Sequence, residues 1–452
     1  MGGFSSLYAD FVCETSYDKL PPQVLVQAKQ RILDLVGVAL AGYKLMEFPR
    51  LVVSYVASLE GASEATVIQT KRKFPAINAA LANAACGHAI DMDDGHRLAA
   101  LHPGTVVVPA GLAAAEMSGA SSKRFIAGIV VGYEVMIRIG MAINPSSLQR
   151  GFHTTGIVGP FGAAAATANI MRLNHEETIA ALGLAGLQGA GLLQVNHELD
   201  GAKVKPISPA RAAMSGLLSS VLAQKGAQGP LNIFGGEDGF LKAVADQVED
   251  DLLTRDLGQE FEISRAYYKL YAACRHAHPS IDAALEACGN GQIDPEEIST
   301  ISIQTYPVAI RLAGIVHPST PSAARFSIPF SVALALMKKD ASANEYSEGN
   351  IKDEDIQSLS GKVQLSVSSK WENLYPDKRG ATVSIVDVRK RVWSAEVELA
   401  KGDPENPASW EEIYSKFHAN ATLLISKNDA QTLGECIMNL ENLPLDEFTR
   451  LI

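Results

Sequence analysis

The stretch GFHTTGIVGPFGAAAATANIM, residues 151–171, decides the fold of this chain. It is the longest run without Asp, Glu, Lys or Arg, and Gly and Ala supply most of its second half. Small side chains let neighbouring helices approach closely, so the stretch predicts a core helix with its lead-in loop in a compact multi-helix domain. Its Ala, Gly and Thr content and Pro160 argue against a membrane span.

The same helical character extends outward from this stretch, from about residue 20 to about residue 250. Pro21-Pro22 predicts a helix start, and Gly42 predicts the end of that helix. Gly, Ala and Ser recur on the apolar faces, as in 181–186 (ALGLAG). Further helices are expected near 75–89, 108–118, 123–141, 157–171, 175–190, 209–225 and 238–248.

The pattern changes after about residue 265. Residues 298–306 (ISTISIQTY) alternate with the period of two that is typical of a half-buried strand. Further strands are expected at 363–367, 382–386 and 392–399, the last two as a hairpin, and helices at 279–289 and 322–338. This mixture predicts an α+β domain.

The tail from about residue 408 returns to helical patterning, and we expect it to pack back on the first domain. The predicted fold class is therefore mostly α with an α+β lid. A discontinuous all-helical domain would consist of residues 1–266 and 402–452, with the α+β lid domain, residues 267–401, inserted between them.

The composition limits the function. The 452 residues carry a net charge of −11 and no Lys/Arg run of five or more, so we expect no nucleic-acid partner and no membrane partner. The five cysteines are scattered without a C-x-x-C pair, which argues against a disulfide framework and a structural zinc site. Charged and polar residues interrupt the first 20 positions, and we expect a cytoplasmic protein, or a mitochondrial one if the source is eukaryotic.

The segment HAIDMDDGHR, residues 88–97, with His102-Pro103 after it, is the sharpest candidate for chemistry. Asp91 and Asp94 are three residues apart and would share a helical face with His88. A carboxylate beside an imidazole can hold the imidazole in one tautomer or shift its pKa towards neutrality, and proton transfer requires both. A solvated helix end with an Asp cap is the structural alternative.

Two other chemical interpretations of this segment were weighed. A D-x-D-D tetrad is the protonating acid of class II terpene cyclases, but those enzymes are longer and have aromatic pockets, whereas only 6% of this chain is aromatic. Asp and His also bind divalent metals, but the spacing is neither H-x-x-x-H nor that of the facial triad. We therefore expect no metal.

Three later segments carry further candidate residues. His153 opens the Ala/Gly-rich helix, where backbone N–H groups favour an anion. Lys205 precedes a helix start, where an ammonium and a helix N-terminus would pair with one carboxylate. Lys269, with Arg275 and His276, lies at the domain boundary, where an anion-binding cleft is plausible. A capped helix, a surface lysine and a solvated basic loop are the respective structural alternatives.

Taken together, these segments resemble the MmgE/PrpD family, which includes 2-methylcitrate dehydratases, cis-aconitate decarboxylases and iminodisuccinate epimerase. The resemblance covers nearly the whole chain in order. It rests on Ala28-Lys29 through Asp34, Gly42, His88 through Asp94, His102-Pro103, Gly151-Phe152-His153, Lys205-Pro206, Lys269 through Pro279 with Asp282, Ala324-Arg325-Phe326-Ser327 and Lys401 through Pro407.

The resemblance implies a helical domain made from both ends of the chain, an inserted lid, a homodimer and an active site in the cleft between the domains. It places Asp91, His102, His153, Lys205 and Lys269 on pocket positions of the decarboxylase branch. It also implies a small polycarboxylate substrate and no cofactor.

Two positions depart from that branch. Gly95 stands where the branch has a threonine, and His96-Arg97 follow with one extra residue before His102. Phe330 stands where the branch has a tyrosine after the Arg-Phe-Ser segment, so we expect a lost pocket hydroxyl. Cis-aconitate decarboxylation is therefore not assumed.

The family reactions all move a proton on a carbon next to a carboxylate, so negative charge must develop beside fixed cations. We assign His102 and His153 to acid–base catalysis, with Asp91 orienting an imidazole and Lys269 as a catalytic cation. Substrate binding is assigned to Lys205, Arg275, His276, His96 and Asp94. The resulting hypothesis is a lyase that dehydrates a 2-methylcitrate-like acid or decarboxylates a cis-aconitate-like one. An epimerase of a substituted dicarboxylate such as iminodisuccinate, and a non-catalytic carboxylate-binding protein, stay open as alternatives.

Overall fold

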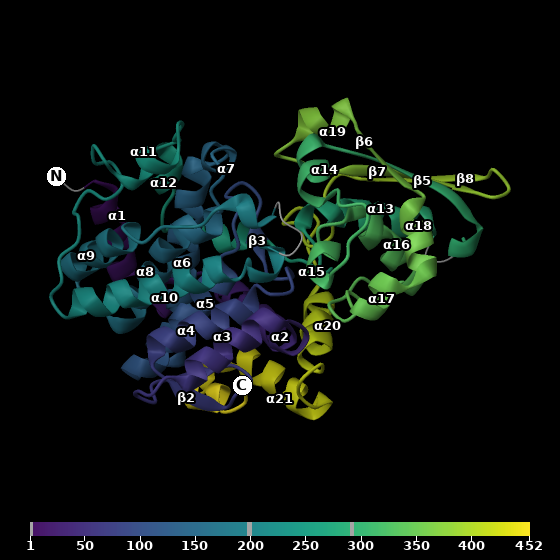
Figure 1. Cartoon of the computed structure of the whole chain (residues 1–452). Coiled ribbons are helices and arrows are strands. Elements are labelled where there is room, and N and C mark those ends of the chain that lie inside the picture. Colours follow the sequence, from purple (N-terminus) through teal and green to yellow (C-terminus); the bar gives the residue numbers. More distant parts are fainter. Residues whose placement is uncertain (1–2, 197–200, 290–292) are drawn as a thin grey trace.

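The computed structural model describes residues 3–196, 201–289 and 293–452, and it forms two lobes (Figure 1). The helical lobe consists of α1–α12 together with α20–α22. The lid consists of the sheet β5–β8 together with α13–α19. A short antiparallel ladder between β3 (Gly95–His96) and β4 (Ala266–Tyr267) lies where the chain passes from the first lobe to the second. The mostly α fold class with an α+β part is confirmed.

Most helices of the helical lobe lie in the predicted segments, whereas α1, α3, α7 and α12 were not predicted. The helices before the lid are α1 Phe4–Glu14, α2 Pro22–Leu45, α3 Glu47–Ser58, α4 Ala76–Gly87, α5 Gly104–Ser118, α6 Ser122–Ile143, α7 Ser146–Gln149, α8 Thr154–Met171, α9 His175–Gly186, α10 Ile207–Gln224, α11 Phe240–Val244 and α12 Asp251–Thr254. A small hairpin, β1 Ala65–Val67 with β2 Arg72–Phe74, joins α3 to α4. The expected helix at 238–248 is shorter than predicted and ends at Val244.

Glycines allow α6, α8 and α10 to pack at close range. Every residue of α8 is buried. A Cβ added at Gly162 of α8 would lie 2.6 Å from Met136 Cβ of α6, and one at Gly216 of α10 would lie 2.3 Å from Ala163 Cβ of α8. The backbones therefore approach to distances that only small residues permit, as the opening stretch predicts.

Within the residues that the structure describes, one helix, α6, is long and apolar enough to cross a membrane by length and composition. The whole of its apolar window is buried inside the structure. Core helices of folded domains share these properties, and α6 packs against α5 and α8 in the helical lobe.

The lid is built around one mixed sheet in the order β6-β5-β7-β8. Its strands are β5 Ile298–Thr305, β6 Val363–Val367, β7 Ala381–Asp387 and β8 Val392–Val397; β5 and β6 are parallel and the other pairs antiparallel. Its helices are α13 His278–Ala287, α14 Pro307–Ala313, α15 Pro321–Ala324, α16 Ile328–Lys338, α17 Glu348–Lys352, α18 Glu354–Gly361 and α19 Ser369–Leu374. Strict alternation of burial along β7 gives the sheet one apolar face, against which α13 packs.

The C-terminal segment returns to the helical lobe as α20 Trp410–Ala421, α21 Lys427–Met438 and α22 Leu445–Thr449. In Figure 1 these helices (yellow) lie beside α2, and α20 and α21 both contact α2. Phe417 and Leu433 join the same hydrophobic core as the first half of the chain. The expected return of the tail is therefore observed, while the boundaries at 266/267 and 401/402 stay predictions.

Candidate active site

A cavity of about 100 Å³ lies between the two lobes. The helical lobe and the connection to the lid contribute charged and titratable groups to its wall, namely Asp91, His102, His153, Lys205 and Lys269. The far wall carries Cys274, Arg275, His276, Phe326, Tyr375 and Arg379. The cavity therefore brings together seven of the nine predicted site residues.

The loop after α4 carries the acidic cluster, and buried cations hold its backbone. Three successive carbonyl oxygens accept hydrogen bonds from three such cations: Arg325 Nε to Ile90 O at 3.0 Å, Lys269 Nζ to Asp91 O at 2.8 Å and Lys416 Nζ to Met92 O at 2.8 Å. Asp91 adopts a left-handed backbone conformation, with φ of 51°. The buried carbonyls are thereby satisfied without regular secondary structure.

The Asp91 side chain lies between two lysines. Its Oδ1 atom is 3.1 Å from Lys205 Nζ and 3.2 Å from Lys269 Nζ. Burial by itself raises the pKa of this carboxyl, but Lys205 and Lys269 outweigh burial and hold the pKa of Asp91 well below its usual range. Asp91 is therefore ionised, and it neutralises part of the positive charge that the lysines bring to the cavity.

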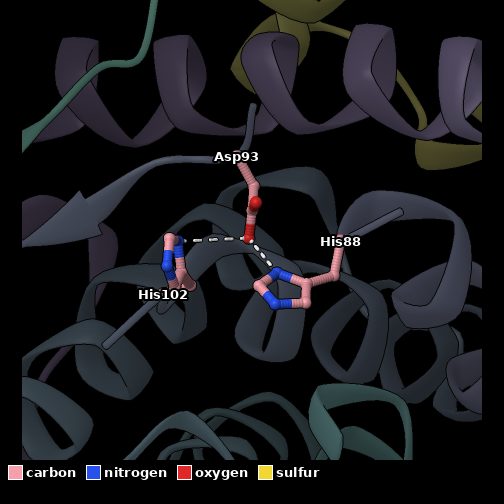
Figure 2. A group of neighbouring side chains, drawn as sticks. All are labelled: His88, Asp93 and His102. Atoms are coloured by element: carbon pink, nitrogen blue, oxygen red, sulfur yellow. Dashed lines mark hydrogen bonds and ion pairs between the residues drawn. The ribbon is translucent and has the colours of Figure 1, made fainter. Parts of the chain in front are cut away.

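The imidazoles of His88 and His102 both approach one carboxylate oxygen, Asp93 Oδ2 (Figure 2). His88 Nδ1 lies 2.8 Å from that oxygen and His102 Nδ1 lies 3.5 Å from it. His102 Nδ1 also lies 2.7 Å from the carbonyl oxygen of Asp94. Because a carbonyl only accepts, Nδ1 of His102 carries the proton, and Nε2 of the neutral ring keeps its lone pair.

His153 stands at the N-terminal end of α8, and its Nδ1 lies 3.0 Å from Ser208 Oγ of α10. Its ring centroid is 6.0 Å from that of His88, so three imidazoles occupy one region. Burial is the main cause that lowers the pKa of His88, His102 and His153 well below the usual value. These rings are therefore neutral near pH 7 and able to accept protons.

The lid side of the cavity holds Arg275 and His276 as predicted. Arg275 Nη2 pairs with Asp403 Oδ2 at 3.0 Å, and Nη1 donates to the carbonyl oxygens of Tyr268 and Lys401. His276 Nδ1 lies 2.6 Å from the Tyr306 hydroxyl oxygen. Burial raises the pKa of the neighbouring Cys274 thiol, which agrees with a packing role and not a nucleophilic one.

Two predicted substrate-binding residues do not line the cavity. Asp94 accepts hydrogen bonds from Gly104 N at 3.0 Å and Tyr133 Oη at 2.8 Å, and it therefore fixes the start of α5. Burial raises the pKa of Asp94 to about 6. His96 points to a separate pocket, where its Nε2 lies 3.3 Å from Glu262 Oε2.

The orienting carboxylate was also assigned to the wrong aspartate. Within the described part of the chain, Asp91 makes no hydrogen bond to an imidazole, and its Oδ1 pairs with Lys205 and Lys269 instead. Asp93, which the sequence analysis gave no separate role, is the carboxylate that meets two rings. The motif spacing alone does not show which of the two aspartates in this irregular loop meets the lysines and which meets the imidazoles.

The two positions that depart from the decarboxylase branch have different surroundings. A Cβ at Gly95 would lie 2.4 Å from Tyr267 Oη, so the missing side chain makes room for a phenol that lines the cavity. Phe330 is fully buried in the lid core beside Tyr346 and does not line the cavity. The expected loss of a pocket hydroxyl at position 330 is therefore not supported.

His88, Asp93 and His102 place three possible metal-ligand atoms within 4.8 Å of one another. Asp93 Oδ2 already accepts a hydrogen bond from His88 Nδ1, however. His102 Nδ1 carries a proton, which it donates to the carbonyl oxygen of Asp94. A metal at Asp93 Oδ2 would have to compete with the hydrogen bond from His88 Nδ1. These residues therefore fit a hydrogen-bonded acid–base cluster better than a preformed metal site, and the expected lack of a metal stays a prediction.

Tyr267 and Arg379 line the cavity but were not predicted. Tyr267 was overlooked beside Lys269, where only the cations were selected. Arg379 lies in the run Asp377-Lys378-Arg379, which has the pattern of an exposed basic loop. No sequence signal separates this arginine from its exposed neighbours, since its burial depends on the lid meeting the helical lobe.

Comparison with known proteins agrees with this two-lobe architecture. The MmgE/PrpD N-terminal domain model matches residues 7–252, and the MmgE/PrpD C-terminal domain model matches residues 271–442. The chain is 25% identical to the cis-aconitate decarboxylase-like protein oryM of Aspergillus oryzae, over 97% of this chain and 95% of that protein. It is 26% identical to cis-aconitate decarboxylase of Aspergillus terreus (98% and 94%) and 23% identical to that of Homo sapiens (94% and 89%).

Proposed function

Because the chain belongs to the MmgE/PrpD family, we propose that it is a lyase that acts without a cofactor on a small polycarboxylate. The observation that carries the proposal is a cavity in which neutral imidazoles face two buried lysines. The similarity to cis-aconitate decarboxylases over nearly the full chain favours decarboxylation of a cis-aconitate-like acid. Dehydration of a 2-methylcitrate-like acid is the alternative within the same lyase class.

The electrostatics of the cavity suit the charge that such a reaction develops. When a cis-aconitate-like acid loses CO₂, a carbon–carbon bond breaks and its electron pair spreads over the neighbouring double bond and carboxylate. Lys205 and Lys269 are fixed by Asp91 before substrate binds, so they meet this charge with little rearrangement. Their burial strengthens the interaction, because water does not screen it.

One proton must then be added to carbon for each CO₂ released. We assign this donation to His153: the ring takes up a proton from solvent, donates it to carbon and so returns to its neutral form, in which Nδ1 lies against Ser208 Oγ. Dehydration needs a base in addition, and Nε2 of His102 has the lone pair for that role. The two reactions therefore differ in whether His102 must accept a proton.

The test is incubation with cis-aconitate in deuterated water, followed by proton and carbon NMR. We expect CO₂ release, a shifted double bond and one deuteron on carbon in the product. A panel of citrate, 2-methylcitrate and aminated dicarboxylates extends the test. Loss of water from 2-methylcitrate without CO₂ release would replace decarboxylation by dehydration.

Epimerisation of a substituted dicarboxylate is the second candidate function. Two neutral imidazoles in one cavity provide two bases for opposite faces of a carbon atom, which this reaction requires. Deuterium uptake without a new alkene or CO₂ would favour it. Turnover that is unchanged after replacement of His153 or Lys269 would remove the site assignment altogether. The homodimer and the cytoplasmic location also remain proposals; sedimentation equilibrium at twice the mass of one chain would support the former.

A further inference from the structure

Arg379 is a buried guanidinium in the cavity wall that has no carboxylate partner. Its side chain is 8% exposed, and it comes from the loop before β7. Nη2 donates to the carbonyl oxygen of Arg97 at 2.6 Å, and Nε has no hydrogen-bond partner. Within the described ranges, no Asp or Glu oxygen lies within 4.0 Å of it, although it is always charged.

Each of the other Lys and Arg side chains of the cavity already has a carboxylate partner. Lys205 and Lys269 share Asp91, and Arg275 pairs with Asp403. A buried unpaired charge is strongly unfavourable unless an anion meets it. Arg379 is therefore the cation of the described cavity wall that still requires an anionic partner, and the cavity is where that partner can lie.

The hydroxyl of Tyr267 is a second polar group without a partner in the same wall. The residue is 4% exposed and lines the cavity, and no hydrogen bond to its Oη is found within the described part of the chain. Its ring lies under Arg275, with 4.7 Å between Cζ and the ring centroid. The space for this phenol exists because position 95 is glycine, as a Cβ there would lie 2.6 Å from Tyr267 Cζ.

We propose that Arg379 and Tyr267 form a carboxylate-binding subsite in the cavity wall, separate from the group formed by Lys205, Asp91 and Lys269. The subsite recognises a substrate carboxylate that does not react, so it selects acids with two or more carboxylates over monocarboxylates. This inference rests on the proposed function, since it places that substrate in the cavity. The guanidinium offers Nε–H to one oxygen, and the phenol donates to the other.

The anchoring of Arg379 suits it for this role. The loop that carries it is held by Gly380, where a Cβ would lie 2.1 Å from the Trp371 ring, so the backbone lies directly against that ring. Its bond to Arg97 O connects the lid to the helical lobe. A carboxylate bound by Arg379 is therefore held by a side chain that is anchored to both lobes. Loss of the Arg379 side chain is expected to weaken substrate binding more than it slows the chemical step.

The test measures binding of tricarballylate, a saturated tricarboxylate, by calorimetry to the full chain and to three variants. We expect Arg379→Gln to weaken binding about 10- to 100-fold and Tyr267→Phe to weaken it a few-fold. Arg389→Gln is the matched control, because Arg389 is an exposed lid arginine paired with Glu297, and it should bind like the parent chain. Butyrate, a monocarboxylate, should bind much more weakly to every form.

The outcomes separate this inference from the proposed function. Unchanged tricarballylate affinity in both Arg379→Gln and Tyr267→Phe overturns the subsite even where cis-aconitate is turned over. Failure of the parent chain to bind tricarballylate at millimolar concentration overturns it as well. Arg379-dependent binding without turnover of any acid supports the subsite and removes the lyase proposal. Thermal denaturation identifies a variant that has lost its fold, and Tyr267→Phe, which removes one oxygen atom, then decides.

Discussion

His102 is the residue whose ring nitrogen is best defined by its surroundings. Its Nδ1–H donates to Asp94 O, so Nε2 keeps its lone pair as an acceptor, and the residue lines the cavity. For dehydration, in which His102 must accept a proton, we expect His102→Gln to lower kcat about 10²- to 10⁴-fold, the usual contribution of a positioned acid–base group. His175→Gln is the control, because His175 is an exposed histidine paired with Asp10. Steady-state kinetics on the confirmed substrate would measure both, and equal loss in the two variants would contradict the assignment.

The pH dependence of the reaction follows from the burial of the His102 imidazole. Burial lowers the pKa of His102 well below its usual value, and Asp93 only partly opposes that shift. A lowered pKa means that the ring stays neutral as the pH falls through about 6.5, the value of an exposed histidine. We therefore expect kcat/KM for dehydration to stay level down to at least that pH and to fall only in more acidic solution. If kcat/KM instead begins to fall above pH 6.5, the pKa of His102 is not lowered and the prediction is wrong.

The sequence predicted that acidic and imidazole side chains meet here, but it did not predict which pairs form. Asp91, Asp93 and Asp94 lie within four residues, yet each has different partners. Asp91 meets two lysines and Asp93 meets two imidazoles. Asp94 meets the start of α5 and the hydroxyl of Tyr133. A helical periodicity had placed Asp91 and Asp94 on one face with His88. The segment is instead an irregular loop whose carbonyls are bound by cations from distant parts of the chain, and no local pattern encodes that.

At the scale of elements, close helix packing makes particular glycines sensitive to the smallest substitution. A Cβ at Gly216 of α10 would lie 2.3 Å from Ala163 Cβ and 2.6 Å from Pro160 O of α8. We expect Gly216→Ala to destabilise the fold by about 1–3 kcal/mol, as overpacking does. Gly361→Ala, at the end of α18 with no atom within 4 Å of the added Cβ, is the matched control and should change stability by less than about 0.5 kcal/mol. Urea denaturation compares the two, and equal stabilities would contradict the packing argument.

The sequence predicted helix or strand correctly where the hydrophobic pattern extended over many residues. It did not predict where a helix ends when a capping residue interrupts the pattern. The region 322–338 was expected as one helix. It forms α15 and α16 instead, because Ser327 caps the second helix by accepting from Phe330 N. The interruption places Arg325 so that Nε reaches Ile90 O and Phe326 so that it lines the cavity, so the missed cap has a direct consequence for the site.

At the scale of the whole molecule, the two lobes share a hydrophobic core. The core of the lid includes Val38 and Ala41 of α2, and Ile90 and Met92 of the acidic loop. The sequence pattern predicted two domains and the family resemblance implied a cleft between them, but neither indicated that α2 would supply part of the lid's core. The contact arises because α2 is buried on both sides, between the helical lobe and the lid.

This shared core predicts that the two lobes unfold together. Separating them would expose Val38, Ile90 and Met92 and would leave Lys269 and Arg325 without the carbonyls that they bind. Buried donors that lose their acceptors are strongly unfavourable, so a state with only one lobe folded has little stability. We expect tryptophan fluorescence and far-ultraviolet circular dichroism to report one coincident thermal transition. Fluorescence follows mainly the lid, which holds Trp371 and Trp393, whereas circular dichroism follows mainly the helical lobe.

A single substitution in the lid sharpens this prediction. Ile301 is fully buried in β5, and Ile301→Ala is expected to remove about 2–5 kcal/mol of stability. If the lobes are cooperative, both signals move to lower temperature by the same amount, because the helical lobe loses the surface that the lid covers. If the fluorescence transition alone moves and the circular dichroism transition stays in place, the lobes are independent. Independent lobes would also mean that the hydrogen bonds from the lid to the acidic loop contribute little to stability, and that the cavity can open without unfolding either lobe.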